Sequence, residues 1–178
     1  MITFVSGGAR SGKSAVAEQR VRATSGARGV ACYYLATARA GDAEMARRID
    51  RHRRERGEGW ITLEAQLDLP GALERVTPGS AVLLDCLTLW ASQAMFEAGL
   101  DASEGRAMLA RTLGEARRRA LDLVVVSNDL NEDVPPRHAV ARRYLAFLQA
   151  LHRDLAREAD RVIEVVAGQA IDWKGGDG

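Results

Sequence analysis

The sequence predicts an α/β fold in which a mostly parallel central sheet carries helices on both faces. Five short apolar runs, rich in β-branched residues, lack the polar alternation of a half-exposed strand, as is typical of strands buried on both faces of a parallel sheet. Helical patterns alternate with these runs, which indicates a doubly wound arrangement with right-handed crossovers. A glycine-rich segment joins the first run to the first helical pattern.

The expected strands cover residues 2–6, 30–35, 81–85, 123–127 and 162–166, and the expected helices cover residues 13–24, 42–56, 102–121 and 137–159. The last helix carries one apolar stripe, formed by Val140, Tyr144, Phe147, Leu148, Leu151 and Leu155. With 178 residues, 47% of them hydrophobic, the chain suits a single domain spanning residues 1–178.

The composition excludes several classes of partner. Lys and Arg number 25 against 24 Asp and Glu, so the net charge of +1 gives no field that would attract nucleic acid or an acidic membrane. No apolar stretch approaches the ~20 residues that span a bilayer. The N-terminus shows no basic stretch followed by an apolar one, so we expect a cytoplasmic protein. Cys32 and Cys86 lie in apolar runs and are expected to be buried core thiols.

The first strand is followed by a phosphate-binding motif. Residues 7–14 match the pattern G-x-x-x-x-G-K-S of P-loop NTPases and read Gly7, Gly8, Ala9, Arg10, Ser11, Gly12, Lys13 and Ser14. Glycines let backbone N–H groups turn toward an anion, and the helix that follows adds the positive end of its dipole. Lys13 is then the catalytic cation at the β- and γ-phosphates, and the Ser14 hydroxyl a ligand of Mg²⁺. A glycine-rich turn that binds nothing is the alternative, but the position between strand and helix favours a P-loop NTPase-type fold.

The apolar run 81–85 ends in the carboxylate of Asp85. In P-loop folds such an Asp helps to hold Mg²⁺ beside the phosphate loop, so we expect Ser14 and Asp85 to share one ion. Many strands end in Asp, and a residue that merely terminates the strand is the alternative interpretation.

The charged segment 42–56 contains one histidine. On a helix of 3.6 residues per turn, His52 shares a face with Met45 and Ile49, amid arginines that would suit an anionic nucleotide. A neutral, positioned imidazole can attack phosphorus, but a packed imidazole on a solvated basic helix fits the same pattern, and the residues alone leave both readings open. His138 follows two prolines at a helix start and His152 lies off the apolar stripe, so both are expected at the surface.

Three blocks of the sequence resemble the bifunctional adenosylcobinamide kinase / adenosylcobinamide-phosphate guanylyltransferases of cobalamin biosynthesis. The first is the phosphate loop itself. The second comprises Ala36, Thr37, Asp42, Glu44, Met45, Arg48, Ile49, His52, Arg53, Arg56, Trp60, Thr62 and Glu64. The third runs from Leu84 through Asp85, Cys86, Leu87, Thr88 and Leu89 to Trp90. The second block is the most specific, because a plain P-loop protein has no reason to carry it.

The resemblance implies two reactions. A nucleoside triphosphate phosphorylates the aminopropanol hydroxyl of adenosylcobinamide, and GMP from GTP is then transferred to that phosphate through a GMP-histidine intermediate. The nucleotidylated histidine of the family falls on His52, and Arg53, Glu64 and Asp85 join the phosphate loop as expected nucleotide-binding residues. The implied ligands are Mg²⁺, GTP, ATP and adenosylcobinamide, and known members are homotrimers.

The second half of the chain departs from the family pattern. Asp129 stands where the family commonly has Glu, and His152-Arg153 stand where it has Asn-Gln. The changes leave the phosphate loop and His52 untouched, so they concern contacts near the cobinamide or the kinase step. Two other functions are weighed against this one: a generic small-molecule P-loop kinase without a covalent adduct, and a regulatory nucleotide-binding protein without catalysis.

Overall fold

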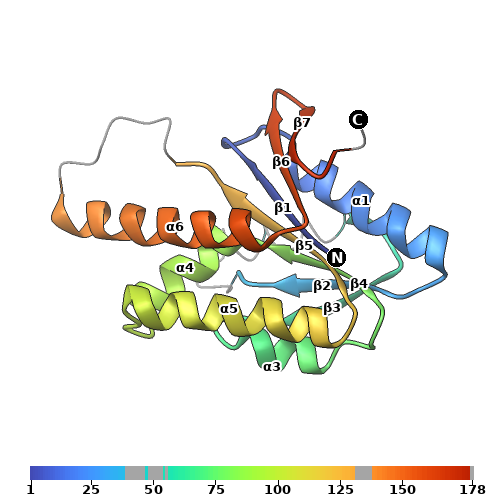
Figure 1. The fold of residues 1–178 in the computed structure, drawn as a ribbon, viewed down its shortest axis with the longest axis horizontal. Coiled ribbons are helices and arrows are strands. Elements are labelled where there is room, and N and C mark those ends of the chain that lie inside the picture. The colour runs from blue at the N-terminus through green and yellow to red at the C-terminus, as the bar shows by residue number, and fades with distance from the viewer. Residues whose placement is uncertain (39–46, 48–53, 55, 131–137, 177–178) are drawn as a thin grey trace.

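A seven-stranded sheet organises the molecule (Figure 1). The computed structural model describes residues 1–38, 47, 54, 56–130 and 138–176. The strand order is β3-β2-β4-β5-β1-β6-β7, and only β6 and β7 pair antiparallel. The strands are β1 Ile2–Gly7, β2 Cys32–Ala36, β3 Trp60–Glu64, β4 Ala81–Asp85, β5 Asp122–Asn128, β6 Arg161–Val166 and β7 Gln169–Lys174. The predicted α/β class with a mostly parallel sheet is confirmed.

Helices cover both faces of the sheet (Figure 1). One face packs on α1 (Lys13–Arg28), and the other on α3 (Leu69–Glu74), α4 (Leu87–Phe96), α5 (Ala102–Arg118) and α6 (Ala139–Glu158). Alternation along the strands divides the core, because neighbouring residues point to opposite faces. Phe4 and Val125 therefore join the α4–α6 side, whereas Val5 and Val126 join the α1 side.

Local signals explain several helix ends. Asp101 and Glu104 form a reciprocal capping box that begins α5. The Asp68 side chain accepts a hydrogen bond from the Gly71 N–H and begins α3. Gly29 ends α1 in the left-handed conformation, with φ of 64°, which a residue without Cβ adopts at no steric cost.

All five expected strands are confirmed, with ends shifted by up to two residues, but four elements were not predicted. These are β3, β7, α3 and α4. The expected helix 42–56 lies largely outside the described residues. Cys32 and Cys86 are buried free thiols, as predicted. None of the helices in the described part of the chain combines the length and the apolar character needed to cross a bilayer.

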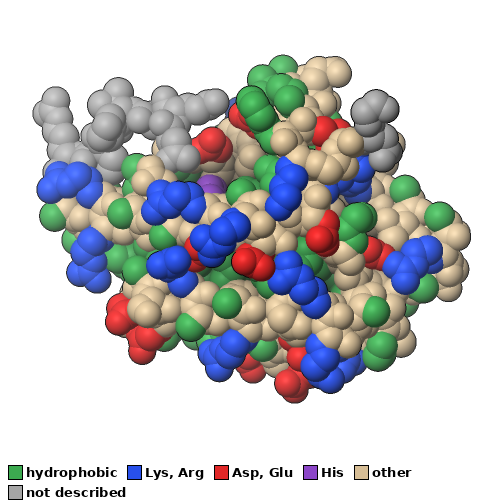
Figure 2. Space-filling model, in the orientation of Figure 1, with side chains coloured by type: hydrophobic (Ala, Val, Ile, Leu, Met, Phe, Trp, Pro, Cys, Tyr) green, Lys and Arg blue, Asp and Glu red, His purple; other side chains and the backbone are tan. Residues whose placement is uncertain are grey.

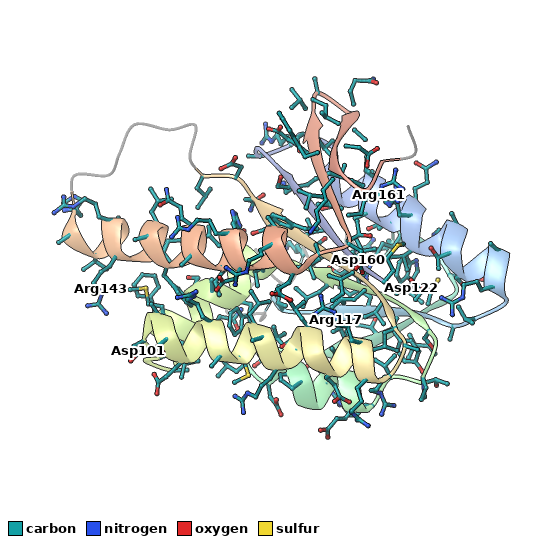
Figure 3. All side chains as sticks on the ribbon, in the orientation of Figure 1. Asp101, Arg117, Asp122, Arg143, Asp160 and Arg161 are labelled. Atoms are coloured by element: carbon teal, nitrogen blue, oxygen red, sulfur yellow. The ribbon has the colours of Figure 1, made fainter. Side chains whose placement is uncertain are left out.

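Charged residues at the amino edge of the sheet have a structural role. Figure 3 shows Asp122 and Asp160 near the chain's N-terminus. Asp122 pairs with the terminal ammonium at 3.3 Å and with Arg28, and the Asp160 carboxylate accepts from the Ile2 N–H at 2.6 Å. Because phosphate loops lie at the opposite, carboxyl edge of such sheets, these acids belong to the scaffold.

A basic band runs along α6 and its boundary with α5 (Figure 2). Two of its arginines pair with acids across the boundary: Arg106 binds Asp154 at 2.5 Å, and Arg117 binds Glu158 at 3.1 Å. Exposed pairs of this kind contribute little to stability, because solvent screens them. These two pairs therefore join α5 to α6.

Candidate nucleotide-binding site

The predicted phosphate loop leaves the end of β1 and leads directly into α1. Arg10 and Gly12 have left-handed φ values of 61° and 91°, which turn the backbone sharply before the first helical residue, Lys13. The Lys13 side chain is buried, and its Nζ donates to the Gly8 carbonyl at 3.1 Å. This hydrogen bond holds the Lys13 side chain over the loop. In P-loop proteins, the β- and γ-phosphates of the nucleotide bind at that place.

One buried oxygen of the loop fits an anion site. Among the described residues, Ser11 Oγ has no hydrogen-bond partner although it is buried. An unsatisfied buried hydroxyl costs about 1–3 kcal/mol, so it is rare unless a ligand completes it. A phosphate oxygen would accept from this hydroxyl, which supports nucleotide binding by the loop.

The turn of the β6–β7 hairpin contacts the phosphate loop. The sequence analysis did not predict this contact. The Gly168 N–H, in the turn of the hairpin, donates to the Ser11 carbonyl at 2.8 Å. A Cβ on Gly7 would lie 2.5 Å from the Val165 carbonyl oxygen, and one on Gly12 would lie 3.3 Å from the Gly168 Cα. The close approach of β6 therefore requires glycine at position 7, whereas at Gly12 the left-handed torsion is the main requirement and the contact with the turn is only tight.

Asp85 ends β4 at the same carboxyl edge. β5 lies between β4 and β1, so Asp85 and the phosphate loop are separated by two strand spacings, roughly 10 Å of sheet. A carboxylate at that separation can approach a phosphate-bound Mg²⁺ directly or through water. Ser14, half-buried in the first turn of α1, supplies a hydroxyl on the loop side. Hydroxyl and carboxylate oxygens are the donors that Mg²⁺ prefers, so the two residues fit the ion.

Cys86 follows Asp85 across a cis peptide bond, and its backbone is hydrogen-bonded to Thr37 of the second sequence block. Thr37 Oγ1 accepts from the Cys86 N–H at 2.8 Å and donates to the Cys86 carbonyl at 2.9 Å. The Gln93 side chain in turn donates to the Thr37 carbonyl at 2.6 Å. Burial raises the pKa of the Cys86 thiol to about 11, with a further contribution from the charge of Asp85, so this thiol stays protonated.

Arg56, on the far side of the charged segment, is also anchored near Asp85. Its guanidinium stacks on the Tyr34 ring, and the Tyr34 hydroxyl donates to the Asp85 carbonyl at 3.4 Å. Arg22 of α1 donates to the Arg56 carbonyl. The segment that carries the candidate nucleophile is thus attached to the sheet on both sides, at Thr37 and at Arg56.

His152 was expected at the surface, and that prediction is wrong. The residue is half-buried, its ring lies 5.3 Å from the Phe4 ring, and its Nε2 is 2.7 Å from Ser127 Oγ. Ser127 Oγ also lies 2.9 Å from Thr88 Oγ1. Desolvation lowers the pKa of His152 to about 4, against a smaller opposing effect of the Asp129 charge, so the imidazole is neutral at pH 7. His138 is exposed, as expected.

The structure brings some predicted site residues together and leaves others apart. The loop residues 7–14 and Asp85 share the carboxyl edge of the sheet. Glu64 is exposed at the end of the edge strand β3, with β2, β4 and β5 between it and β1, so it does not adjoin the loop within this chain. His52 and Arg53 lie outside the described residues. The sequence analysis did not identify Ser127 and His152 as residues near the site. They are connected by a hydrogen bond between residues far apart in the sequence, and no local pattern predicts such a bond.

Comparison with known proteins agrees with this geometry. Residues 3–173 match the family model of cobinamide kinase / cobinamide phosphate guanyltransferase. The chain is 40% identical to the bifunctional adenosylcobalamin biosynthesis protein CobP of Pseudomonas aeruginosa, over 98% of both chains. It is 30% identical to the bifunctional adenosylcobalamin biosynthesis protein CobU of Escherichia coli, over 98% of this chain and all of the relative. A KaiC-like protein from Pyrococcus horikoshii shares the fold, with a TM-score of 0.53 at 12% identity over 92% of this chain and 69% of the other.

Proposed function

The chain belongs to the cobinamide kinase / cobinamide phosphate guanyltransferase family, and on this premise we propose that it makes adenosylcobinamide-GDP through a GMP-histidine intermediate at His52. Family membership makes it a bifunctional transferase of cobalamin biosynthesis with the P-loop NTPase-type fold. The substrates are adenosylcobinamide, a nucleoside triphosphate such as ATP for the first reaction, and GTP for the second.

In the kinase reaction, the phosphate loop holds the triphosphate of the nucleotide. The aminopropanol hydroxyl oxygen attacks the γ-phosphorus, the nucleoside diphosphate leaves, and the hydroxyl proton is released. Lys13 Nζ turns from the Gly8 carbonyl to the β- and γ-phosphates, where its charge offsets the charge that develops in the transition state. Mg²⁺, held by Ser14 and Asp85 together with phosphate oxygens, would supply further charge neutralisation.

In the guanylyltransfer reaction, a ring nitrogen of His52 attacks the α-phosphorus of GTP and pyrophosphate leaves. A phosphate oxygen of adenosylcobinamide phosphate then attacks the same phosphorus, which releases His52 and gives adenosylcobinamide-GDP. Attack requires a neutral imidazole, and the neighbouring arginines of the segment favour it by like-charge repulsion. We include Arg53 and Glu64 among the residues that bind the nucleotide in this reaction.

One observation carries the proposal. The segment between Thr37 and Arg56 is attached at both ends to the carboxyl edge where Lys13 and Asp85 lie. This attachment supports the proposal that a nucleophile on the segment acts on a nucleotide bound by the loop. A generic kinase would need no such attachment, which is why we favour the bifunctional reading.

Incubation with GTP and Mg²⁺ followed by intact-mass spectrometry tests the proposal. We expect the wild-type protein to gain the mass of GMP, and the adduct to be lost in acid and kept in alkali, as for a phosphoramidate. His52→Ala should abolish the adduct but keep most kinase activity, whereas His138→Ala, at an exposed histidine, should keep both. Phosphorylated product without an adduct would support the generic kinase, and retained intact nucleotide would support the regulatory protein.

We extend the proposal to assembly and location by family analogy. The chain acts as one domain, residues 1–178, assembles as a homotrimer and works in the cytoplasm. Light scattering on the purified protein checks the assembly, because a monomeric mass at micromolar concentration would contradict it.

A further inference from the structure

A buried hydrogen-bond chain connects α6 to the carboxyl end of β5. It begins at His152 Nε2, passes through the hydroxyls of Ser127 and Thr88 at 2.7 and 2.9 Å, and ends at the Asn128 N–H, which donates to Thr88 Oγ1 at 2.8 Å. Ser127 and Thr88 are buried, so water does not compete for these groups. The Tyr144 hydroxyl holds the start of α4 by donating to the Thr88 carbonyl at 2.8 Å.

The end of β5 occupies a central place in the site. Its residue Ser127 pairs in register with Ser6, directly before the phosphate loop, and Asp129 N–H donates to the Gly7 carbonyl at 2.9 Å. On the other side, Val126 pairs with Asp85. A shift of Ser127 or Asn128 would therefore move backbone that lies between the two groups expected to hold the nucleotide phosphates and Mg²⁺.

The tautomer of His152 sets the direction of the hydrogen-bond chain. When the neutral imidazole carries its proton on Nδ1, Nε2 accepts from the Ser127 hydroxyl, Ser127 Oγ accepts from the Thr88 hydroxyl, and Thr88 Oγ1 accepts from the Asn128 N–H. Each of the two hydroxyls then donates once and accepts once within the chain. A protonated ring can only donate at Nε2, so the Ser127 hydroxyl would lose the imidazole as its acceptor. Burial of the ring disfavours that state.

We propose that His152 is a positioning residue for phosphoryl transfer, which acts through Ser127 and Thr88 to hold the end of β5 between the phosphate loop and Asp85. The inference rests on the proposed function. His152 does not touch the phosphates in this role; it acts on the backbone that lies beside them. Misplacement of reacting groups by about 1 Å can cost on the order of 100-fold in rate, so a partial loosening has a measurable effect.

The experiment compares five variants of the full-length protein in the kinase reaction, one of which combines His152→Leu with Ser127→Ala. His152→Leu keeps an apolar contact with Phe4 but removes the bond to Ser127, whereas His152→Gln places an amide group near the position of Nε2. Ser127→Ala breaks the chain from the other side. Arg157→Gln, at an exposed position of the same helix, is the control. For each variant we would measure kcat, the KM and Kd for the nucleoside triphosphate, and the melting temperature.

We expect His152→Leu and Ser127→Ala each to lower kcat by about tenfold, with the nucleotide Kd changed less than about threefold. The kcat of the double variant should lie within about threefold of that of either single variant, because both substitutions break the same hydrogen-bond chain. His152→Gln should keep kcat within about threefold of the wild type. The inference is overturned if kcat of His152→Leu equals that of Arg157→Gln, or if His152→Gln is as slow as His152→Leu.

Two further results keep the test decisive. Should His152→Leu fail to fold, the comparison of Ser127→Ala with His152→Gln replaces it, and a slow glutamine variant of unchanged melting temperature then contradicts the inference. A wild-type protein that never phosphorylates adenosylcobinamide contradicts the proposed function itself, which separates the two failures.

Discussion

The guanidinium carbon of Arg56 lies 3.3 Å from the centroid of the Tyr34 ring, and only 6% of Arg56 is exposed. A second pair of the same kind, Arg22 over Trp60, has a distance of 5.3 Å and an exposed arginine. Since a desolvated cation is held more strongly by an aromatic face than a solvated one, the two pairs should differ in energy.

Double-mutant cycles measure that difference. Combining Arg56→Met with Tyr34→Leu should give a coupling free energy of about 2 kcal/mol, against about 0.5–1 kcal/mol for Arg22→Met with Trp60→Leu. Urea unfolding of the single and double variants supplies both values. Equal couplings would show that burial of Arg56 does not strengthen its stacking on Tyr34.

Lys13→Ala should lower the rate of phosphoryl transfer by about 100- to 1,000-fold or more, because the side chain supplies charge at the β- and γ-phosphates. The fold should survive, since Lys13 Nζ donates to a carbonyl of the phosphate loop and not to the core of the sheet. Lys174→Ala removes the only other lysine, which is bonded to the Arg157 carbonyl at 3.0 Å, and is the control. Turnover of Lys13→Ala at the level of Lys174→Ala would refute the assignment of Lys13.

Asp85→Asn should raise the Mg²⁺ concentration required for half-maximal activity, because an amide oxygen attracts the ion less than a carboxylate does. Asp101→Asn makes the same change at the N-cap of α5, where Asn and Asp cap about equally well, and should leave the titration unchanged. If the Mg²⁺ titrations of wild type and Asp85→Asn coincide, Asp85 does not help to hold the ion and is only the last residue of β4.

The lowered pKa of His152 predicts a loss of stability in acid. In the unfolded chain the ring binds a proton near its ordinary pKa of 6.5, whereas in the folded protein it does so only near 4. Between these values the unfolded state binds more protons, so the free energy of unfolding falls as pH falls. The shift corresponds to at most about 3 kcal/mol.

Urea unfolding between pH 6.5 and pH 4 tests this linkage. His152→Gln has no group that titrates there, so the stability difference between wild type and variant should shrink or change sign toward pH 4. Parallel stability curves for the two proteins across this range would contradict the assigned pKa.

Local pattern predicted the elements that build the middle of the fold. Strands buried on both faces, such as β4 and β5, give continuous apolar runs, and the long amphipathic helices α5 and α6 give clear periodicity. α4 escaped prediction because it is apolar on most of its surface, with Trp90 and Ala91 fully buried, so it shows little periodicity. The six-residue α3 is too short to show a helical period, and β7 is exposed along its whole length, so it has no buried apolar run.

The sequence by itself determined the phosphate loop, the α/β class and the family, because each depends on residues that are adjacent or closely spaced along the chain. Only the tertiary structure decided what surrounds the loop: the β6–β7 turn against Gly7 and Gly12, and the contact between His152 and Ser127. Helical periodicity placed His152 away from the apolar stripe, which is correct for α6 alone. Its burial arises from β1 and β5, strands far away in sequence, and such long-range packing leaves no local signal.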